Sequence, residues 1–306
     1  MTGDVSNAFA NSLARGRIAC SQHLTATPLE MSRPDFREQV VPLGDASLYV
    51  WRLRATSRPA LSAGPVLVFL HDSLGCVDTW RDFPEALAGR AGLDAVNYDR
   101  QGYGRSSAFG TTSRTPEYLE EQATVLFALL DALAIETVVL FGHSDGGSIA
   151  LIAAAIQPRR VAAVVTEGAH VFVEDVTLAG VRAAREAFAT TDLPERLARY
   201  HGEKVQGVAT AWIDTWLSPA FRTWSIERYL PAIACPVLAI QGEDDEYGTM
   251  AQVRAIVDGA RAKSLVIPGV GHTPHRDARD EVLAATAEFI TRAVRKRSDE
   301  AADARH

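Results

Sequence analysis

The stretch Thr137–Gly147, with the sequence TVVLFGHSDGG, decides the fold of this chain. Its first half is an apolar run that predicts a strand buried on both faces. Its second half places Gly-x-Ser-x-Gly around Ser144, and an alanine-rich stretch with helical spacing follows. In this order of strand, sharp turn and helix, we expect the Ser144 hydroxyl to project above a sheet edge. The turn is tight, so small residues are needed beside Ser144, and Gly142 and Gly146 supply them.

Segments with strand and helix patterns alternate on both sides of this stretch. Strands are predicted at 38–42, 47–53, 65–70, 93–98, 137–141, 161–166, 236–241 and 264–267, and helices at 80–90, 118–133, 147–156 and 281–295. This alternation predicts a mostly parallel sheet with helices on both faces. The first two strands are joined by a turn at Gly44, which predicts an antiparallel edge. Residues 174–230 show no convincing buried strand, so we expect helices inserted over the carboxyl edge of the sheet, where such sheets bind ligands.

The length of 306 residues suits one large α/β domain with an inserted subdomain. We expect an N-terminal extension at 1–36, a core formed by 37–173 and 231–297, a helical cap at 174–230, and a C-terminal tail at 298–306. The extension has no apolar core typical of a secretion signal. No apolar run is long enough to span a membrane. The sequence therefore predicts a cytoplasmic protein without a membrane partner.

The composition excludes several classes of partner. A net charge of −7 argues against nucleic acid as the main partner. The three cysteines, Cys20, Cys76 and Cys235, are widely scattered and are expected to be reduced. The histidines lack metal-ligand spacing, and no Gly-x-Gly-x-x-Gly fingerprint follows the first strand, so we expect no metal and no cofactor. Whether the chain forms a homodimer is left open.

A serine needs an adjacent base to become a nucleophile, and the base needs an acid that orients it. Gly242–Asp245 follows the strand predicted at 236–241, and His272 follows the strand predicted at 264–267. The carboxyl ends of parallel strands meet at one sheet edge, so these residues are expected near Ser144. On this placement alone Asp244 competes with Asp245, and the nearby His275 competes with His272.

Over residues 37–296 the chain resembles an α/β-hydrolase. Five segments in family order carry the resemblance: His71–Gly75 at the oxyanion loop, Asp99–Ser106 at an Asp-x-Arg-Gly-x-Gly-x-Ser turn, Gly142–Gly147, Gly242–Asp245, and Gly271-His272. The resemblance implies an eight-stranded, mostly parallel α/β-hydrolase fold with a helical cap after the sixth strand. It implies a small capped serine hydrolase of the esterase, lactonase or carbon–carbon hydrolase type.

The resemblance also implies roles for individual residues. Ser144 is the expected nucleophile, His272 the base, and Asp245 the orienting acid, because the family spacing Gly-x-x-Asp selects it. The backbone N–H groups of Ser73 and Asp145 are the expected oxyanion hole.

Two acids depart from the family pattern. Asp72 stands where glycine is usual, and Asp145 follows the nucleophile where an apolar residue is common. We expect both to form salt bridges with Arg100 or Arg105. The alternative is an acidic pocket that prefers a cationic substrate.

The expected substrate contacts are His71, His170, Phe172, Trp212 and Trp216. The leading function is hydrolysis of a small carboxylic ester or lactone through an acyl-enzyme. Cleavage of a carbon–carbon bond in a diketone-type ring-cleavage product is the alternative. A non-catalytic ligand receptor with this fold represents another class. Epoxide hydrolases of this fold use a carboxylate nucleophile, which Ser144 does not provide.

Overall fold

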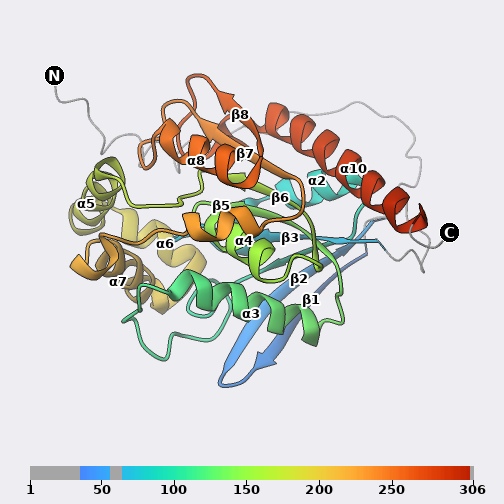
Figure 1. The fold of residues 1–306 in the computed structure, drawn as a ribbon. Helices are drawn as coiled ribbons and strands as arrows, with labels where there is room; N and C mark the ends of the chain where they lie inside the picture. Colours follow the sequence, from blue (N-terminus) through green and yellow to red (C-terminus); the bar gives the residue numbers. More distant parts are fainter. Residues whose placement is uncertain (1–34, 56–63, 304–306) are drawn as a thin grey trace, which may run out of the picture.

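The computed structural model describes residues 35–55 and 64–303. The extension predicted at 1–36 lies outside the described residues except for Asp35 and Phe36, which already belong to the first strand. Cys20 also lies outside them. The described chain places one twisted sheet between two layers of helices (Figure 1).

The structure contains eight strands and nine α-helices within the described residues. The strands are β1 (Asp35–Leu43), β2 (Ala46–Arg54), β3 (Val66–Leu70), β4 (Ala95–Tyr98), β5 (Val138–His143), β6 (Val161–Glu167), β7 (Val237–Gly242) and β8 (Lys263–Ile267). The α-helices are α2 (Phe83–Ala91), α3 (Tyr118–Ala132), α4 (Asp145–Ile156), α5 (Asp175–Thr190), α6 (Leu193–His201), α7 (Val205–Trp216), α8 (Met250–Ala260), α9 (Pro274–Asp277) and α10 (Arg279–Asp303). Short 3-10 helices are η1 (Val77–Trp80), η2 (Gly202–Lys204), η3 (Pro219–Phe221) and η4 (Glu227–Ala232).

The sheet has the order β1-β2-β4-β3-β5-β6-β7-β8. The β1–β2 and β2–β4 pairs are antiparallel, and the remaining pairs are parallel. This arrangement confirms the predicted eight-stranded, mostly parallel sheet with an antiparallel edge. The parallel strands place β5, β6, β7 and β8 with their carboxyl ends at one edge of the sheet, which is where the candidate site forms.

Both faces of the sheet are covered, as the continuous apolar strands predict. In β3, Val68 and Leu70 belong to the core that also contains buried residues of α3, α4 and α8. Leu67 and Phe69 of the same strand belong to the opposite core, with buried residues of α2 and α10. Adjacent residues of a strand point to opposite faces, so a strand covered on both sides is apolar at every position.

The helices α5, α6 and α7 follow the sixth strand and precede β7, where the inserted helices are expected. They gather at one end of the molecule, beyond the sheet (Figure 1). The exact domain limits at 173/174 and 230/231 remain a prediction. None of the helices in the described part of the chain is long and apolar enough to cross a membrane.

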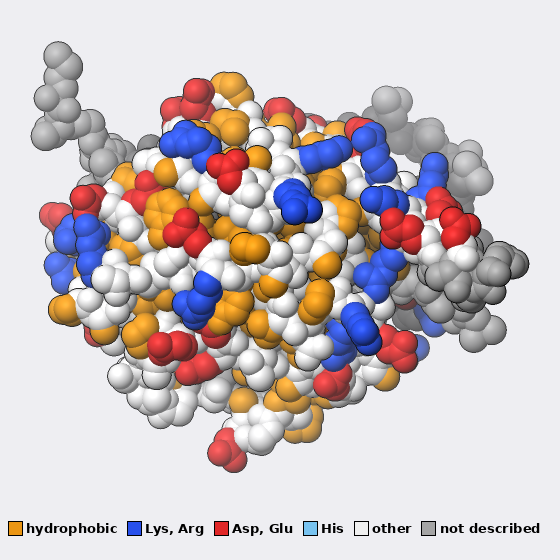
Figure 2. All heavy atoms as spheres, viewed as in Figure 1, with side chains coloured by type: hydrophobic (Ala, Val, Ile, Leu, Met, Phe, Trp, Pro, Cys, Tyr) orange, Lys and Arg blue, Asp and Glu red, His pale blue; other side chains and the backbone are white. Residues whose placement is uncertain are grey.

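The surface seen from the same side mixes both signs of charge. Figure 2 shows Lys and Arg side chains interspersed with Asp and Glu side chains on this face, with apolar side chains between them. Binding driven by electrostatics uses a patch of one sign, and this face of the described chain does not present a large one.

Two helices differ from their predicted limits. The helix predicted at 80–90 is divided, because Arg81 has φ 54° and so ends η1 before α2 begins at Phe83. The helix predicted at 281–295 continues to Asp303, so most of the tail expected at 298–306 is helical. The sequence after 295 contains neither glycine nor proline. Lys296 and Glu300, one turn apart on this helix, form an ion pair at 3.7 Å that supports the extension.

Candidate active site

Ser144 occupies a strained turn between β5 and α4. Its backbone has φ 54° and ψ −118°, a region that side-chain-bearing residues rarely adopt. A Cβ added to Gly142 would lie 2.1 Å from the carbonyl oxygen of Gly146, and one added to Gly146 would lie 1.9 Å from that of Leu70. The turn therefore requires glycine on both sides of Ser144, as predicted, and such strain is typical of functional positions.

His272 and Asp245 form a close pair at the ends of β8 and β7. The imidazole Nδ1 lies 2.9 Å from each carboxylate oxygen of Asp245. Asp245 Oδ1 also accepts the backbone N–H groups of Tyr247 at 2.8 Å and Gly248 at 3.3 Å, which fixes the carboxylate. Of the two adjacent acids, Asp245 rather than Asp244 is thus the partner of His272. Because Nδ1–H donates to the carboxylate, Nε2 is left as the basic nitrogen.

The pair is electrostatically matched. Burial lowers the pKa of His272, but the neighbouring Asp245 carboxylate outweighs this and raises it to about 9. For Asp245 the two effects have the opposite signs. Burial raises the pKa of this carboxyl group, but the charge of His272 lowers it more, so the pKa of Asp245 lies below its usual value. The site therefore favours an imidazolium beside a carboxylate, the state that a histidine base reaches after it takes a proton.

Ser144 and His272 face one cavity of about 380 Å³. The other lining residues are Asp72, Ser73, Leu74, His170, Thr177, Val181, Trp212, Trp216 and Tyr247. Within the described residues no hydrogen bond joins the Ser144 hydroxyl to His272. Bonds between a nucleophile and its base are often long before substrate binds. The helices α5 and α7 supply four of the lining residues, so the inserted segment closes the cavity over the sheet edge.

Three of the five expected substrate contacts line this cavity, namely His170, Trp212 and Trp216. The other two do not. His71 is fully buried, where its Nε2 accepts the N–H of Arg100 at 3.1 Å and its ring packs on Tyr103. Phe172 forms a backbone bridge with Ser225 and packs against the core. The side chains of His71 and Phe172 thus make contacts within the protein instead of lining the cavity. Their positions in the sequence do not reveal these contacts.

His275, the competitor of His272, belongs to a different pair. Its Nδ1 lies 2.5 Å from Glu167 Oε2, and its backbone N–H also donates to that carboxylate. His143 donates from Nε2 to the carbonyl oxygen of His272 at 2.8 Å. His143, Glu167 and His275 offer ligand atoms within 4.8 Å of one another and could hold a metal ion. Their hydrogen bonds to one another and to the His272 loop give them a structural use as well.

Sequence reasoning missed Glu167, the fully buried last residue of β6. Its carbonyl oxygen accepts the N–H of Ser144 at 2.8 Å, while its carboxylate holds His275. Glu167 thus touches both sides of the site. The sequence did contain a signal for Glu167: it is an acid that directly follows the apolar run 161–166, at the sheet edge where site residues were expected.

Asp145 is buried and paired. Its Oδ2 lies 3.6 Å from Arg100 Nη1 and accepts the hydroxyl of Tyr118 at 3.1 Å. Tyr118 in turn accepts the indole N–H of Trp216 at 3.0 Å, so a chain of polar contacts runs from α7 to the turn at Ser144. The expected salt bridge with Arg100 is confirmed, and Asp145 does not line the cavity.

Arg100 also holds the loop that carries Ser73. Its Nη2 donates to the carbonyl oxygen of Asp72 at 2.7 Å. A trans peptide group places its C=O and N–H on opposite sides, so the N–H of Ser73 points away from Arg100. Arg100 therefore contacts both segments whose N–H groups were expected to form the oxyanion hole.

Asp72 does not form the salt bridge expected for it. Its carboxylate accepts the N–H of Leu74 at 3.3 Å and lies 3.9 Å from His143 Nδ1. The other candidate, Arg105, pairs instead with Asp78 at 2.9 Å, where both side chains are nearly half exposed. Asp72 therefore keeps its carboxylate at the mouth of the cavity, where its side chain is 30% exposed.

Comparisons with known proteins agree with this architecture. The model of the alpha/beta hydrolase family matches residues 67–285. The human serine hydrolase BPHL is 31% identical over 201 residues, which cover 64% of this chain and 68% of that protein. An epoxide hydrolase from Caballeronia sordidicola is 42% identical over 103 residues, but the match spans only 33% of this chain and 30% of that protein.

Among solved structures, the enol-lactonase from Burkholderia xenovorans LB400 superposes with a TM-score of 0.65 at 20% identity. The superposition covers 83% of this chain and 100% of that chain, and it shows a shared fold. The family model covers more than half of the chain and includes the turn at Ser144, Asp245 and His272. This chain belongs to the alpha/beta hydrolase family.

Proposed function

We propose that the protein is a serine hydrolase that cleaves a small carboxylic ester or lactone through an acyl-enzyme. The observation that carries the proposal is the 2.9 Å pair of His272 and Asp245 at a cavity that also exposes Ser144 on its strained turn. Nucleophile, base and orienting acid are the three groups that acyl transfer by a serine requires.

In the proposed reaction, Ser144 Oγ attacks the acyl carbon while His272 Nε2 accepts the hydroxyl proton. Asp245 stabilises the imidazolium that forms. His272 then returns the proton to the leaving alcohol. A water molecule, deprotonated by the same nitrogen, releases the acid and regenerates Ser144.

The oxyanion hole would use the N–H groups of Asp145 and Ser73. Asp145 is the first residue of α4, and the first N–H groups of a helix have no partner within it. The contact of Arg100 with the Asp72 carbonyl directs the N–H of Ser73 to the other side of the peptide. One such donor typically contributes about 2.7–4 kcal/mol to stabilising the transition state.

Asp145 places a carboxylate next to the proposed oxyanion hole. If that carboxylate faced the oxyanion, it would oppose the developing negative charge. Arg100 and Tyr118 hold this carboxylate away from the cavity. The same pairing weighs against an acidic pocket for cationic substrates built on Asp145.

The lining of the cavity favours a substrate with an apolar acyl part. The cavity that contains Ser144 is also lined by the indole rings of Trp212 and Trp216 and by Leu74 and Val181. Epoxide opening in this fold uses a carboxylate nucleophile, so the serine at position 144 favours ester or lactone cleavage over it.

A fluorophosphonate probe tests the nucleophile. We expect it to label the wild-type protein and Ser298→Ala, a control on the exposed end of α10, but not Ser144→Ala. Absence of labelling of the wild type would favour a non-catalytic receptor. A substrate panel tests which type of bond the protein cleaves. The panel contains p-nitrophenyl esters of increasing chain length, lactones and a ring-cleavage dienone. If only the dienone is turned over, carbon–carbon bond cleavage becomes the proposed activity in place of ester cleavage.

A further inference from the structure

The oxyanion loop, residues 71–75, carries the backbone N–H of Ser73, one of the two proposed oxyanion donors. The peptide groups around this N–H are held in place. Arg100 donates to the carbonyl oxygen of Asp72 at 2.7 Å, and the carboxylate of Asp72 accepts the N–H of Leu74 at 3.3 Å. Within the described residues, the N–H of Ser73 itself donates to no acceptor, although Ser73 is buried and lines the catalytic cavity. Buried N–H groups are rarely left without a partner, so this one suits a ligand in the cavity.

A further contact on this loop comes from the cap. His201, the last residue of α6, is 2% exposed, and its Nε2 donates to the carbonyl oxygen of Leu74 at 2.9 Å. Its other ring nitrogen, Nδ1, accepts the N–H of Gly104 at 3.0 Å. Gly104 belongs to the turn Asp99–Ser106, which also contains Arg100. His201 therefore joins the cap both to the oxyanion loop and to the turn that holds the loop from the core.

The two backbone partners fix the tautomer of His201. A backbone N–H can only donate, so Nδ1 must present a lone pair. A carbonyl oxygen can only accept, so Nε2 must carry the hydrogen. Burial lowers the pKa of this imidazole, which favours the neutral ring that both contacts require. The ring thus sets the separation of two backbone groups in one tautomer and one orientation.

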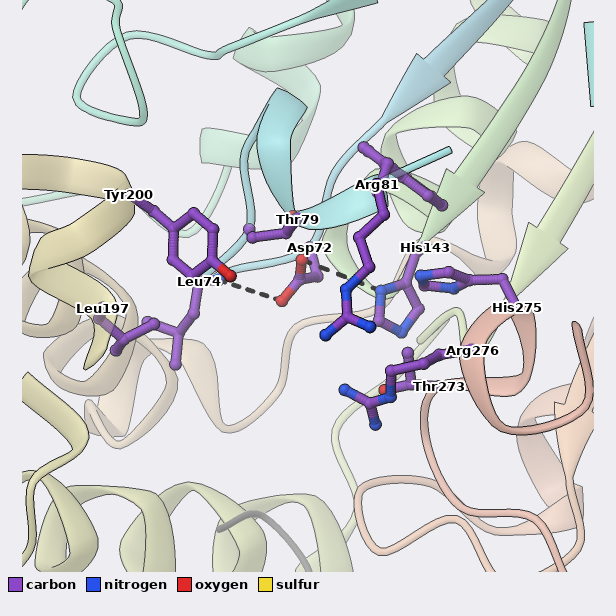
Figure 3. A pocket seen from close by; sticks show the side chains of 12 residues that line it. Asp72, Leu74, Thr79, Arg81, His143, Leu197, Tyr200, Thr273, His275 and Arg276 are labelled. Carbon is purple, nitrogen blue, oxygen red and sulfur yellow. Dashed lines mark hydrogen bonds and ion pairs between the residues drawn. The ribbon is translucent and has the colours of Figure 1, made fainter. Parts of the chain in front are cut away.

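Other cap side chains near His201 make different contacts. Leu197 and Tyr200, also from α6, line a pocket together with Leu74 of the oxyanion loop (Figure 3). Lys204, at the end of η2, donates from Nζ to three carbonyl oxygens of the turn Asp99–Ser106. The hydrogen bonds of Lys204 therefore attach the cap to this turn, whereas those of His201 also reach the loop that carries the proposed donor.

We propose that His201 is a positioning residue for catalysis, through which the cap fixes the direction of the Ser73 N–H in the oxyanion hole. The inference rests on the proposed function. Arg100 holds the peptide group that contains this N–H, and His201 holds the peptide group two residues further on. If the carbonyl oxygen of Leu74 is released, the loop can turn about its remaining anchor and the N–H loses its fixed direction. An oxyanion donor stabilises the transition state to the extent that it is oriented in advance.

Two substitutions separate the two ring contacts of His201. The amide oxygen of asparagine lies near the position of Nδ1, so His201→Asn can keep the contact with Gly104 while it loses the contact with Leu74. The amide nitrogen of glutamine lies near the position of Nε2, so His201→Gln can keep the donor to Leu74. With a p-nitrophenyl ester, we expect His201→Asn to lower kcat about tenfold with a change in KM below about threefold, and His201→Gln to stay within about threefold of the wild-type kcat.

A transition-state analogue gives a readout that a loss of stability does not produce. A trifluoromethyl ketone forms an adduct with a catalytic serine, and the oxyanion of this adduct occupies the oxyanion hole. Its inhibition constant is expected to rise about tenfold in His201→Asn, in parallel with the fall in kcat/KM, and to change little in His201→Gln. The control is Lys204→Met, which loses cap contacts with the turn. It should lower Tm but keep the wild-type kcat and inhibition constant.

The outcomes separate this inference from the proposed function. If His201→Asn and His201→Gln have equal kcat, or if Lys204→Met loses as much kcat as His201→Asn, the positioning role of His201 is overturned and the serine hydrolase is left intact. If the wild type cleaves no ester and Ser144 is not labelled, the proposed function fails instead. Hydrogen–deuterium exchange over residues 71–76 then decides whether His201 fixes the loop. Faster exchange in His201→Asn than in His201→Gln supports this, and equal exchange overturns it.

Discussion

Replacing Arg100 by methionine removes the cation that pairs with the Asp145 carboxylate. Both side chains are almost fully buried, at 2% and 1% exposure, and their charged atoms lie 3.6 Å apart. The substitution leaves Asp145 with a hydrogen bond from Tyr118 at 3.1 Å and without its ion-pair partner. It also removes the donor to the Asp72 carbonyl. A single change therefore disturbs both proposed oxyanion donors.

The expected loss has two parts. Breaking a buried ion pair from one side costs about 3–5 kcal/mol of folding free energy, because an uncompensated charge remains. For a chain of this size, each kcal/mol lowers Tm by about 2–4 °C. Loss of one oxyanion donor lowers kcat by about 10²–10³-fold. The Ser73 donor is misdirected rather than deleted, so we expect kcat to fall by about 10–100-fold, with a smaller change in KM.

A double substitution separates charge from packing. In Arg100→Met/Asp145→Asn the buried charge is gone, so Tm is expected to recover most of the loss and kcat part of it. Thermal unfolding and p-nitrophenyl ester kinetics on the two single variants and the double variant form a complete cycle. If Arg100→Met keeps wild-type kcat, or if Asp145→Asn adds a further loss in its presence, the assigned role of Arg100 is refuted.

Two further predictions concern His272. Since the imidazole is a base only when neutral and its pKa is raised to about 9, kcat/KM should rise about tenfold per pH unit below 9 and level off above it. In Asp245→Asn this limb should move to lower pH, because burial without the carboxylate lowers the pKa; a pH profile with an unchanged limb would contradict the pairing. A Cβ at Gly168, where φ is +57°, would lie 2.9 Å from the His272 ring, so Gly168→Ala should lower kcat. The control Gly44→Ala has φ +58° with nothing within 4 Å, and it should lose similar stability but no activity; equal kinetics of the two variants would count against the role of this contact.

The sequence predicted those features of the fold that depend on residues close together in the chain. The apolar runs predicted the buried strands, because a parallel sheet covered on both sides leaves no polar positions. The turn at Ser144 could be predicted from the sequence because only glycine fits on either side of it. The interruption of the helix at Arg81 could not be predicted. Nothing in Trp-Arg-Asp predicts a positive φ at an arginine, so the helix was expected to run through it.

The contacts that shape the site join residues far apart in the chain. Arg100 meets Asp145, and Glu167 meets His275 across 108 positions. Such pairs form only when the strands lie side by side in the sheet. The periodicity of apolar residues along the sequence reports local structure, so it cannot predict these contacts. The same holds for His71, whose position beside the loop suggested a substrate contact although its ring serves the backbone of Arg100.

The conformation of the turn at Ser144 bears on how new activities arise in this family. The backbone there is held by the two flanking glycines and by the N–H of residue 144 itself, which donates to Glu167. Nothing in that support depends on the serine hydroxyl. Aspartate tolerates positive φ better than most residues. A substitution at this one position can thus exchange the attacking atom while the backbone of the turn is kept, so the fold alone does not fix which type of bond is broken.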